Sequence, residues 1–427
     1  MVDLKTPQVA ETVVSKSDKL LKNKVNFFTR RAQRPTYEVV GELERFDERD
    51  NIFARRSLKP NTPEYEAYYN LHPELREKDE DIRAYDEPQM VRTQREKHFP
   101  HNPLARALGA AVRVSDYLGD KGDGPLAPGR AEADPERMAR NIKGLARYWG
   151  ADMVAISTLN PAWVYSHNGR WFYQGARWGE PVNLDHRYAI TLGFAHHWDM
   201  LLAGRGSSMA AAFETQHIYS LMSLIGIRLA SYIRALGYPA RTQHVTNYQV
   251  LQVPIAIDAG MGELGRLGFM VTKEYGPSIR LVTVTTDLPL ATDAPVDIGV
   301  QDFCQRCRKC ADACPTGAVP HDDKVVVRGV RKWQIDPYRC YRYWHVRGGI
   351  SCYMCMSVCP WTKPRNWLHR LNAQAAARFS LARTLLIGAD DLIYGRKPRL
   401  HAYPSWLRHG EEEPSLKENL STFLHNL

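Results

Sequence analysis

The cysteines of this chain are confined to one short segment. All eight lie between Cys304 and Cys359, and none precedes them. A disulfide framework would be spread over the fold that it staples, so this crowding indicates a local ligand set. The first group reads Cys304-x2-Cys307-x2-Cys310-x3-Cys314-Pro315, and the second reads Cys352-x2-Cys355-x3-Cys359-Pro360, with Cys340 before it.

This spacing predicts two [4Fe–4S] clusters and therefore electron transfer. In bacterial ferredoxins with the first pattern, the fourth cysteine binds the other cluster. We therefore assign one cluster to Cys304, Cys307, Cys310 and Cys359, and the other to Cys314, Cys340, Cys352 and Cys355. Paired CxxC motifs also bind zinc, but two interleaved segments that use every cysteine favour clusters.

The bulk composition sets broad limits. With 427 residues and 44% hydrophobic content, the chain can bury a large core. No apolar stretch is long enough to span a membrane. Arg30-Arg31 is followed by Ala32-Gln33-Arg34-Pro35 and not by an apolar run, so we expect no export signal and a cytoplasmic location. The net charge of +10 leaves open a nucleic acid, an acidic protein partner or a generally basic surface.

Helix and strand patterns alternate before the cysteines, which favours an α/β core. One helix begins with Asp134 as N-cap and Pro135, and it ends at Gly150. A longer helix covers Met209 to Leu236, before Gly237 and Pro239. The predicted strands are Met153 to Ser157, Arg187 to Phe194, Gln249 to Ile257 and Arg280 to Thr286.

These patterns suggest four regions. Residues 1–130 are charged and rich in proline and tyrosine, and we expect them to wrap the core irregularly. Residues 131–300 form the core, and residues 301–365 carry the clusters. Residues 366–427 form a helical tail with a polar end.

Three further features have competing interpretations. An aromatic stretch fits core packing better than a cavity for a flat cofactor or an aromatic substrate: Trp163, Tyr165, Trp171, Phe172, Tyr173 and Trp178. His196-His197-Trp198-Asp199 is best explained as a polar loop. The G-x-G-x-x-G motif from Gly260 to Gly265 follows a predicted strand, but Gly268 interrupts any following helix, so we reject a dinucleotide site there. A turn that lets backbone approach another cofactor stays open.

The order of the motifs resembles that of the corrinoid-dependent reductive dehalogenases. The resemblance covers roughly residues 135–365 and is carried by three segments before the cysteines: Ala259 to Gly268, Tyr275 to Arg280 and Thr286 to Leu290. Epoxyqueuosine reductases share the cofactors and parts of these motifs. The family fold implied is a nitroreductase-like α/β (α+β) core that binds base-off cobalamin, beside a ferredoxin-like domain with two [4Fe–4S] clusters. The sequence has no Asp-x-His-x-x-Gly motif, which is compatible with base-off binding.

The resemblance also implies site residues. Tyr219 matches the tyrosine that supplies a proton, and Thr215, one helical turn earlier, matches a cofactor neighbour. Arg280 matches the arginine that supports this tyrosine, Asn247 a polar pocket residue and Lys273 a lysine of other members. Gly260, Gly262, Gly265 and Arg266 are the remaining expected cofactor contacts.

The implied activity is reductive replacement of a halogen by hydrogen on a small organohalide, at cob(I)alamin reduced through the two clusters. The aromatic stretch makes a halogenated phenol the candidate substrate. A separate donor, such as a ferredoxin or flavodoxin, could dock on the basic run from Lys324 to Arg347, although a solvated basic face explains that run equally well. We expect no nucleic-acid partner. The alternatives are an epoxyqueuosine-reductase-like enzyme acting on tRNA, and an electron carrier of the ferredoxin type.

Overall fold

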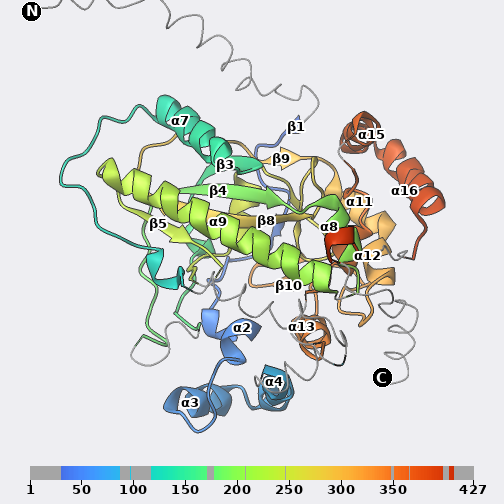
Figure 1. Cartoon of the computed structure of the whole chain (residues 1–427), viewed down its shortest axis with the longest axis horizontal. Coiled ribbons are helices and arrows are strands. Elements are labelled where there is room, and N and C mark those ends of the chain that lie inside the picture. Colours follow the sequence, from blue (N-terminus) through green and yellow to red (C-terminus); the bar gives the residue numbers. More distant parts are fainter. Residues whose placement is uncertain are drawn as a thin grey trace, which may run out of the picture.

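The computed structural model describes residues 30–86, 97, 117–170, 177–206, 208–245, 247–347, 351–364, 366–397 and 403–407. Its centre is a four-stranded antiparallel sheet in the order β3-β4-β8-β5 (Figure 1). These strands are β3 (Met153–Thr158), β4 (Tyr188–Ala195), β8 (Ile279–Thr286) and β5 (Ala240–Gln243). Because every pairing is antiparallel, the mixed α and β composition that we predicted takes an α+β form.

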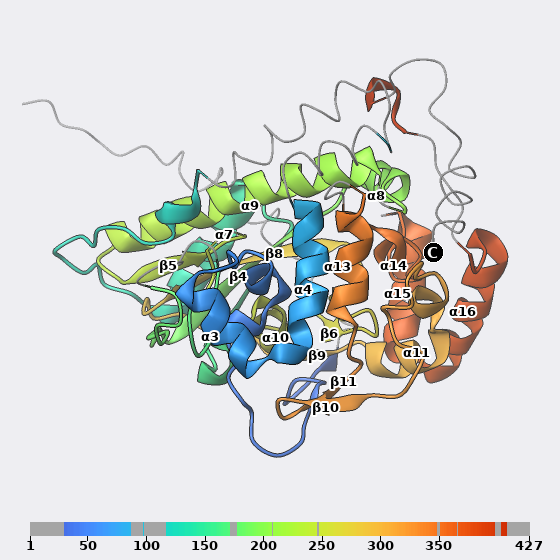
Figure 2. The same ribbon diagram turned by 90° about the horizontal axis from the view of Figure 1, so that it is seen from below.

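The sheet is covered on both faces, as its side-chain alternation requires. Val154 and Ile156 of β3 pack with α7 (Pro135–Tyr148) and α9 (Met209–Ala235), whereas the intervening Ala155 packs with α10 (Gln252–Asp258). Figure 2 shows α9 and α10 on opposite sides of the sheet. The sheet is therefore the middle layer of three.

The helix predictions for this core are confirmed. The side chain of Asp134 accepts a hydrogen bond from Arg137 N and caps α7, with Pro135 in the first position. α9 ends at Gly237, whose φ of +82° is the left-handed conformation that glycine adopts most easily. Three of the four predicted strands are present as β3, β4 and β8.

The fourth predicted strand, Gln249 to Ile257, is wrong. Residues Gln252–Asp258 form α10, and Pro254 lies in its first turn, where a missing N–H costs nothing. A short apolar run cannot be assigned to strand or helix from periodicity alone. The glycine motif therefore follows a helix, and it leads into the small hairpin of β6 (Glu263–Leu264) and β7 (Met270–Val271). No helix follows it, so rejection of the dinucleotide site stands.

The cluster segment packs at one end of the sheet (Figures 1 and 2). It consists of α11 (Val300–Cys307), α12 (Lys309–Asp312), the hairpin β10 (Val325–Val327) and β11 (Val330–Lys332), α13 (Pro337–His345) and α14 (Met354–Ser357). Two antiparallel helices follow, α15 (Trp367–Arg378) and α16 (Ser380–Tyr394). The proposed division of the chain into four regions stays a prediction.

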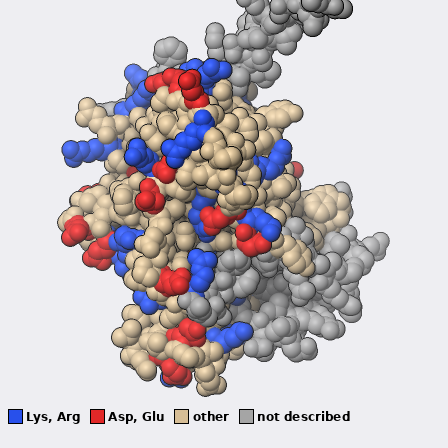
Figure 3. Space-filling model, turned by 90° about the vertical axis from the view of Figure 1, so that its left-hand side faces the viewer, with Lys and Arg blue, Asp and Glu red and all other residues tan. Residues whose placement is uncertain are grey.

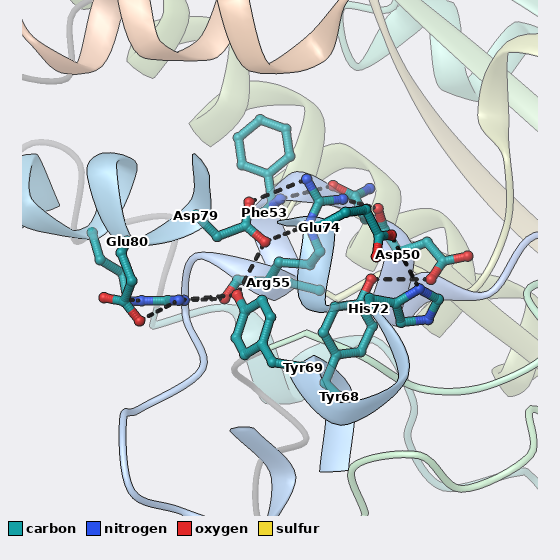
Figure 4. Close-up of polar contacts among 12 residues, drawn as sticks. Asp50, Phe53, Arg55, Tyr68, Tyr69, His72, Glu74, Asp79 and Glu80 are labelled. Carbon is teal, nitrogen blue, oxygen red and sulfur yellow. Dashed lines mark hydrogen bonds and ion pairs between the residues drawn. The ribbon is translucent and has the colours of Figure 1, made fainter. Parts of the chain in front are cut away.

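The N-terminal region is more regular than predicted. It contains α2 (Ile52–Arg55), α3 (Pro63–Leu71) and α4 (Pro73–Asp86), which pack through buried tyrosines and the Arg55–Asp79 ion pair, 2.8 Å (Figure 4). It also wraps the molecule, because β1 (Arg30–Arg31) pairs with β9 (Val296–Asp297) and β2 (Glu38–Val39) pairs with β11. Short elements complete the described chain: α8 (Trp198–Ala203) and the 3-10 helices Glu48–Asp50, Gly119–Lys121, Pro161–Trp163 and Ser405–Leu407.

The structure bears on two expectations, one about membrane-spanning segments and one about surface charge. Within the described residues, no helix combines the length and the apolar character needed to cross a bilayer. On the face drawn in Figure 3, basic and acidic side chains are intermixed, so that face has no field of a single sign.

Candidate functional site

The eight cysteines lie in the two groups that the spacing predicts. A pocket is lined by Cys314, Cys340, Cys352 and Cys355, together with apolar side chains such as Leu267 and Phe269. The other four, Cys304, Cys307, Cys310 and Cys359, are buried in a single apolar cluster with Phe303 and Trp361. Each group therefore brings together sulfurs from segments that are far apart in the sequence.

Burial disfavours the charged thiolate form of these cysteines unless a positive charge lies nearby. It raises the pKa of Cys304 and of Cys352 to about 12, and that of Cys307 and of Cys340 to about 11. Cluster iron supplies such charge, because the thiolate is the form that binds metal. Among the described residues, no group of histidine, cysteine or acidic side chains is arranged around a single metal ion. A four-iron cluster instead takes one thiolate at each iron.

Arg266 holds the first cluster loop in place. Its side chain is fully buried, and its guanidinium donates to the carbonyl oxygens of Cys304 at 3.1 Å and Asp322 at 2.9 Å. It also lies 4.6 Å above the ring of Trp333. These contacts are with the cluster segment, and the assignment of Arg266 to the cofactor stays a prediction.

The glycine motif is packed against the chain itself. A Cβ atom on Gly260 would lie 2.1 Å from the carbonyl oxygen of Ala294, and one on Gly262 would lie 2.3 Å from that of Val271. A Cβ on Gly265 would lie 2.7 Å from a methyl group of Val271. Close approach of neighbouring segments explains the glycines, and their contact with a cofactor stays a prediction.

Tyr219, Arg280 and Thr215 come together between α9 and the sheet. Thr215 and Tyr219 are four residues apart on α9, and Arg280 approaches from β8, where it pairs with Phe194. The guanidinium of Arg280 donates to the phenol oxygen of Tyr219 at 2.9 Å and to the hydroxyl of Thr215 at 3.1 Å. It also lies 4.6 Å from the centre of the Tyr219 ring. The sequence prediction therefore placed these three side chains together correctly.

The electrostatics of this trio keep Arg280 charged. Burial lowers the pKa of Arg280, but the phenol oxygens of Tyr219 and Tyr353 raise it by more, so the net shift is upward. A guanidinium in this position stabilises negative charge on a neighbouring phenol oxygen. The role of Tyr219 as a proton donor stays a prediction.

Tyr353 is a site residue that the sequence analysis missed. Its phenol oxygen lies 2.6 Å from the hydroxyl of Thr215, and burial raises its pKa to about 12. Tyr353 directly follows Cys352, so it connects a cluster ligand to the Tyr219 group through two hydrogen bonds. Its position inside the second cysteine motif was the available signal.

We expected His196 to lie in a polar loop. It does lie in the short connection between β4 and α8, but it is buried. Its side chain is 5% exposed and packs edge-on against the ring of Tyr353, with 5.0 Å between the ring centres. Burial, aided by the charge of Arg280, lowers the pKa of His196 to about 3, so the imidazole is neutral. Trp198 and Asp199 of the same tetrapeptide begin α8.

A cavity of about 250 Å³ lies beside His196. Ser278, Thr362 and Lys363 also line it, so it lies between the core and the segment that follows Cys359. Both ring nitrogens of His196 and the hydroxyls of Ser278 and Thr362 are buried without a hydrogen-bond partner. Buried polar groups are normally paired, so these atoms are available to bond a polar ligand or water.

The other predicted site residues lie in defined surroundings. The Asn247 amide accepts from Arg241 at 2.6 Å and donates to the carbonyl oxygen of Gly119 at 2.7 Å. Lys273 is buried 3.9 Å from Glu274, and burial lowers its pKa. The catalytic roles assigned to Asn247 and Lys273 stay predictions.

Most of the aromatic stretch serves packing. Trp163 and Tyr165 are buried in an apolar cluster, and the Trp163 indole donates to Asp258 at 2.8 Å. Trp178 packs beside the tyrosines of α3. Trp171, Phe172 and Tyr173 lie outside the described residues. Core packing is thus confirmed for the part of the stretch that the structure describes.

Comparison with known proteins agrees with this geometry. Residues 303–363 match the 4Fe-4S dicluster domain family. The tetrachloroethene reductive dehalogenase of Sulfurospirillum multivorans is 32% identical over 296 residues, which cover 62% of this chain and 58% of that protein. The chain is therefore similar to reductive dehalogenases over most of its length.

Two solved reductive dehalogenase structures share the fold. The catabolic enzyme NpRdhA, in complex with 3-bromo-4-hydroxybenzoic acid, has a TM-score of 0.71 and 26% identity, covering 86% of this chain and 49% of its own. A reductive dehalogenase studied for its B12-dependent mechanism has a TM-score of 0.72 and 25% identity, covering 92% and 53%. The chain thus spans about half the length of these two solved proteins.

The relation to epoxyqueuosine reductases is more distant. The enzyme of Pseudomonas aeruginosa is 24% identical over 334 residues, which cover 66% of this chain and 87% of that protein. The predicted family and the mixed α/β fold with a dicluster domain are therefore confirmed.

Proposed function

We propose that this chain replaces a halogen of an organohalide with hydrogen, using cobalamin reduced through two [4Fe–4S] clusters. The observation that carries the proposal is the Arg280–Tyr219 hydrogen bond of 2.9 Å, in a group that reaches Tyr353 and hence Cys352. A proton donor and a route from a cluster meet at one place. One of the solved relatives is a reductive dehalogenase described with a B12-dependent mechanism.

The cavity is too small for a whole corrinoid, but its polar lining fits the amide groups at the periphery of one. The unpaired hydroxyls of Ser278 and Thr362 and the ring nitrogens of His196 would hold it by hydrogen bonds. When bound, cobalamin supplies a cobalt centre of low oxidation state that can deliver two electrons to a carbon–halogen bond. The cysteines would take no part in binding the corrinoid, since all eight thiols are assigned to the two clusters.

The chain's own residues would supply the proton. Conversion of R–X to R–H and X⁻ consumes two electrons and one proton. Tyr219 would donate the proton from its phenol oxygen, and Arg280 would stabilise the phenolate left behind. The hydroxyl of Thr215 accepts a hydrogen bond from the second guanidinium nitrogen of Arg280. This bond holds the guanidinium beside the phenol oxygen of Tyr219, where the proton transfer would need it.

A halogenated phenol is the substrate class that we propose. The aromatic stretch no longer supports it, because its described residues pack in the core. The support comes from NpRdhA, which was solved with a brominated hydroxybenzoic acid. A chloroethene is the competing class, since the Sulfurospirillum relative is a tetrachloroethene enzyme. A cytoplasmic location and a separate ferredoxin or flavodoxin donor stay predictions.

The deciding experiment combines metal content with turnover. After anaerobic purification with cobalamin supplied, we expect one cobalt and about eight iron per chain. Reduced methyl viologen should then drive bromide release from 3-bromo-4-hydroxybenzoic acid. The Tyr219→Phe variant should lose about 10²- to 10⁴-fold in kcat with unchanged metal content. Tyr232→Phe, on the exposed side of the same helix, is the matched control.

Three outcomes would contradict the proposal. Iron without retained cobalt would indicate an electron carrier of the ferredoxin type. Turnover of epoxyqueuosine in tRNA, with no halide released from aromatic or chloroethene substrates, would indicate the epoxyqueuosine alternative. Full activity of Tyr219→Phe would remove the proton donor that the site was built on.

A further inference from the structure

Helix α16 exposes leucines on the side that faces away from the protein. Leu381, Leu385 and Leu392 are 74%, 65% and 86% exposed. At 100° per residue they fall within about 40° of one another, so they form one stripe, which we call the α16 stripe. Scattered exposed leucines need no explanation, but three aligned on one helix indicate a contact surface.

The opposite side of α16 is fixed to the loops of the first cluster. Asp390, half a turn away from the stripe, pairs with the buried Lys309 beside Cys310 and with Lys363 at 2.5 Å. Just past the helix, Arg396 pairs with Asp391 at 2.6 Å and donates to the carbonyl oxygen of Cys307 at 3.0 Å. Helix α16 lies at the outer edge of the molecule (Figures 1 and 2), and its thickness separates the stripe from the loops of the first cluster.

Among the described residues, the charges near the stripe that lack an ion-pair partner are basic. Asp302, which lies beside α16, is itself paired with Arg306 and Arg383. Asp390 and Asp391 are the only acids of α15 and α16, and both are paired with the cations named above. Exposed cations on or after the two helices are Arg370, Arg378 and Lys397, whereas Arg396 is paired within the chain. An apolar centre with a basic rim is complementary to a protein with an acidic rim. In a symmetric dimer through the same patch, the two basic rims would repel each other.

Three cations of the basic run from Lys324 to Arg347, our earlier candidate for donor docking, form ion pairs within the chain. Arg328 pairs with Asp50 at 2.6 Å, Arg331 with Glu38 at 3.1 Å and Arg342 with Asp81 at 2.5 Å. These cations hold the N-terminal region against β11 and α13. They are poorly available to a partner.

We propose that the α16 stripe docks a small acidic one-electron carrier protein of the ferredoxin or flavodoxin class, which reduces the first cluster. This inference rests on the proposed function for its need of a donor. Each carrier delivers one electron and leaves oxidised, so two encounters supply the two electrons that convert R–X to R–H and X⁻. The proton comes from Tyr219.

The test separates docking from catalysis. Turnover by the holoenzyme is driven either by a reduced acidic ferredoxin or by reduced methyl viologen, which needs no docking surface. For Leu385→Glu, and for Leu381→Glu with Leu392→Glu, we expect the ferredoxin-driven kcat/KM to fall about tenfold or more. The viologen-driven rate should not change. Leu71→Glu, a leucine 75% exposed at the end of α3, is the matched control and should change neither rate.

Electrostatics give a second measurement. Arg378→Gln should weaken the ferredoxin-driven reaction and reduce its sensitivity to salt, because one rim charge is lost. Equal ferredoxin-driven rates in wild type and stripe variants would overturn the proposal. So would a dimer that the stripe variants dissociate, or binding of the wild type to anionic vesicles that the variants lose.

Failure of the proposed function would look different. If no organohalide is turned over even with viologen, the docking is measured directly as the rate at which reduced ferredoxin bleaches the cluster absorbance. A slower bleaching in Leu385→Glu, but not in Leu71→Glu, still supports the stripe. Identical bleaching in all three proteins overturns it.

Discussion

The hydroxyl of Thr215 lies 2.6 Å from the phenol oxygen of Tyr353. Thr215 belongs to α9 of the core, and Tyr353 follows the cluster ligand Cys352, so this contact joins the two parts of the site. The same hydroxyl accepts a hydrogen bond from Arg280 at 3.1 Å. A single threonine therefore connects the cluster loop to the cation that supports Tyr219.

Replacing Thr215 with valine should test this connection. Valine keeps the shape but removes the hydroxyl, leaving a buried phenol and a guanidinium nitrogen each short of one partner. Such a loss costs about 1–3 kcal/mol, so we expect kcat to fall about tenfold. Cobalt and iron contents should match those of the wild type. A variant with wild-type kcat would show that the contact does not matter for turnover.

The interleaved cluster assignment can be tested with pairs of cysteines. If Cys310 and Cys314 bind different clusters, Cys310→Ala with Cys314→Ala should remove both, leaving almost no iron. Cys310→Ala with Cys359→Ala should remove only one and leave about four iron per chain. Iron analysis with electron paramagnetic resonance of the reduced proteins distinguishes the cases. The reverse pattern would show that the first four cysteines bind a single cluster.

His196 should make stability depend on pH below the ordinary histidine range. Its pKa is lowered from 6.5 to about 3 in the folded protein, so between these values the unfolded chain binds a proton that the folded chain does not. Stability then falls as pH decreases from 6.5 towards 3, by up to about 1.4 kcal/mol per pH unit. Above pH 6.5 this effect is absent.

The measurement compares thermal unfolding midpoints at about pH 7 and about pH 5.5. In His196→Gln the drop between these two conditions should be smaller than in the wild type. His217→Gln, which changes an exposed histidine of α9, should keep the wild-type drop. Equal drops in all three proteins would argue against a neutral buried His196.

The ion pairs under α16 should contribute strongly to stability. Asp390→Asn leaves Lys363 without its buried counter-charge, and leaves Lys309, 2% exposed, with only the partly exposed Asp391 at 3.2 Å. Breaking such a pair costs about 3–5 kcal/mol, so the anaerobic holoprotein should unfold at a clearly lower temperature. Asp120→Asn, in the exposed Lys121 pair, is the control and should change little. A small effect of Asp390→Asn would show that water or structural relaxation compensates for the lost carboxylate.

The sequence by itself determined the features that depend on local spacing. The cysteine intervals predicted two ligand groups, and the separation of Thr215 and Tyr219 by four residues placed them on one side of α9. The capping of α7 and the glycine at the end of α9 were equally local. Each follows from hydrogen bonds and dihedral preferences within a few residues.

Only the tertiary structure decided the features that depend on distant segments. The antiparallel pairing of β8 with β4 aims Arg280 at Tyr219, and the cluster fold brings Tyr353 and His196 beside it. The short apolar run at α10 was ambiguous because length and packing, not periodicity, separate strand from helix. α16 is apolar on both sides, and the Asp390 pairs decide which side is buried. Long-range packing, which no short sequence window contains, therefore determines both the group around Tyr219 and the proposed docking surface.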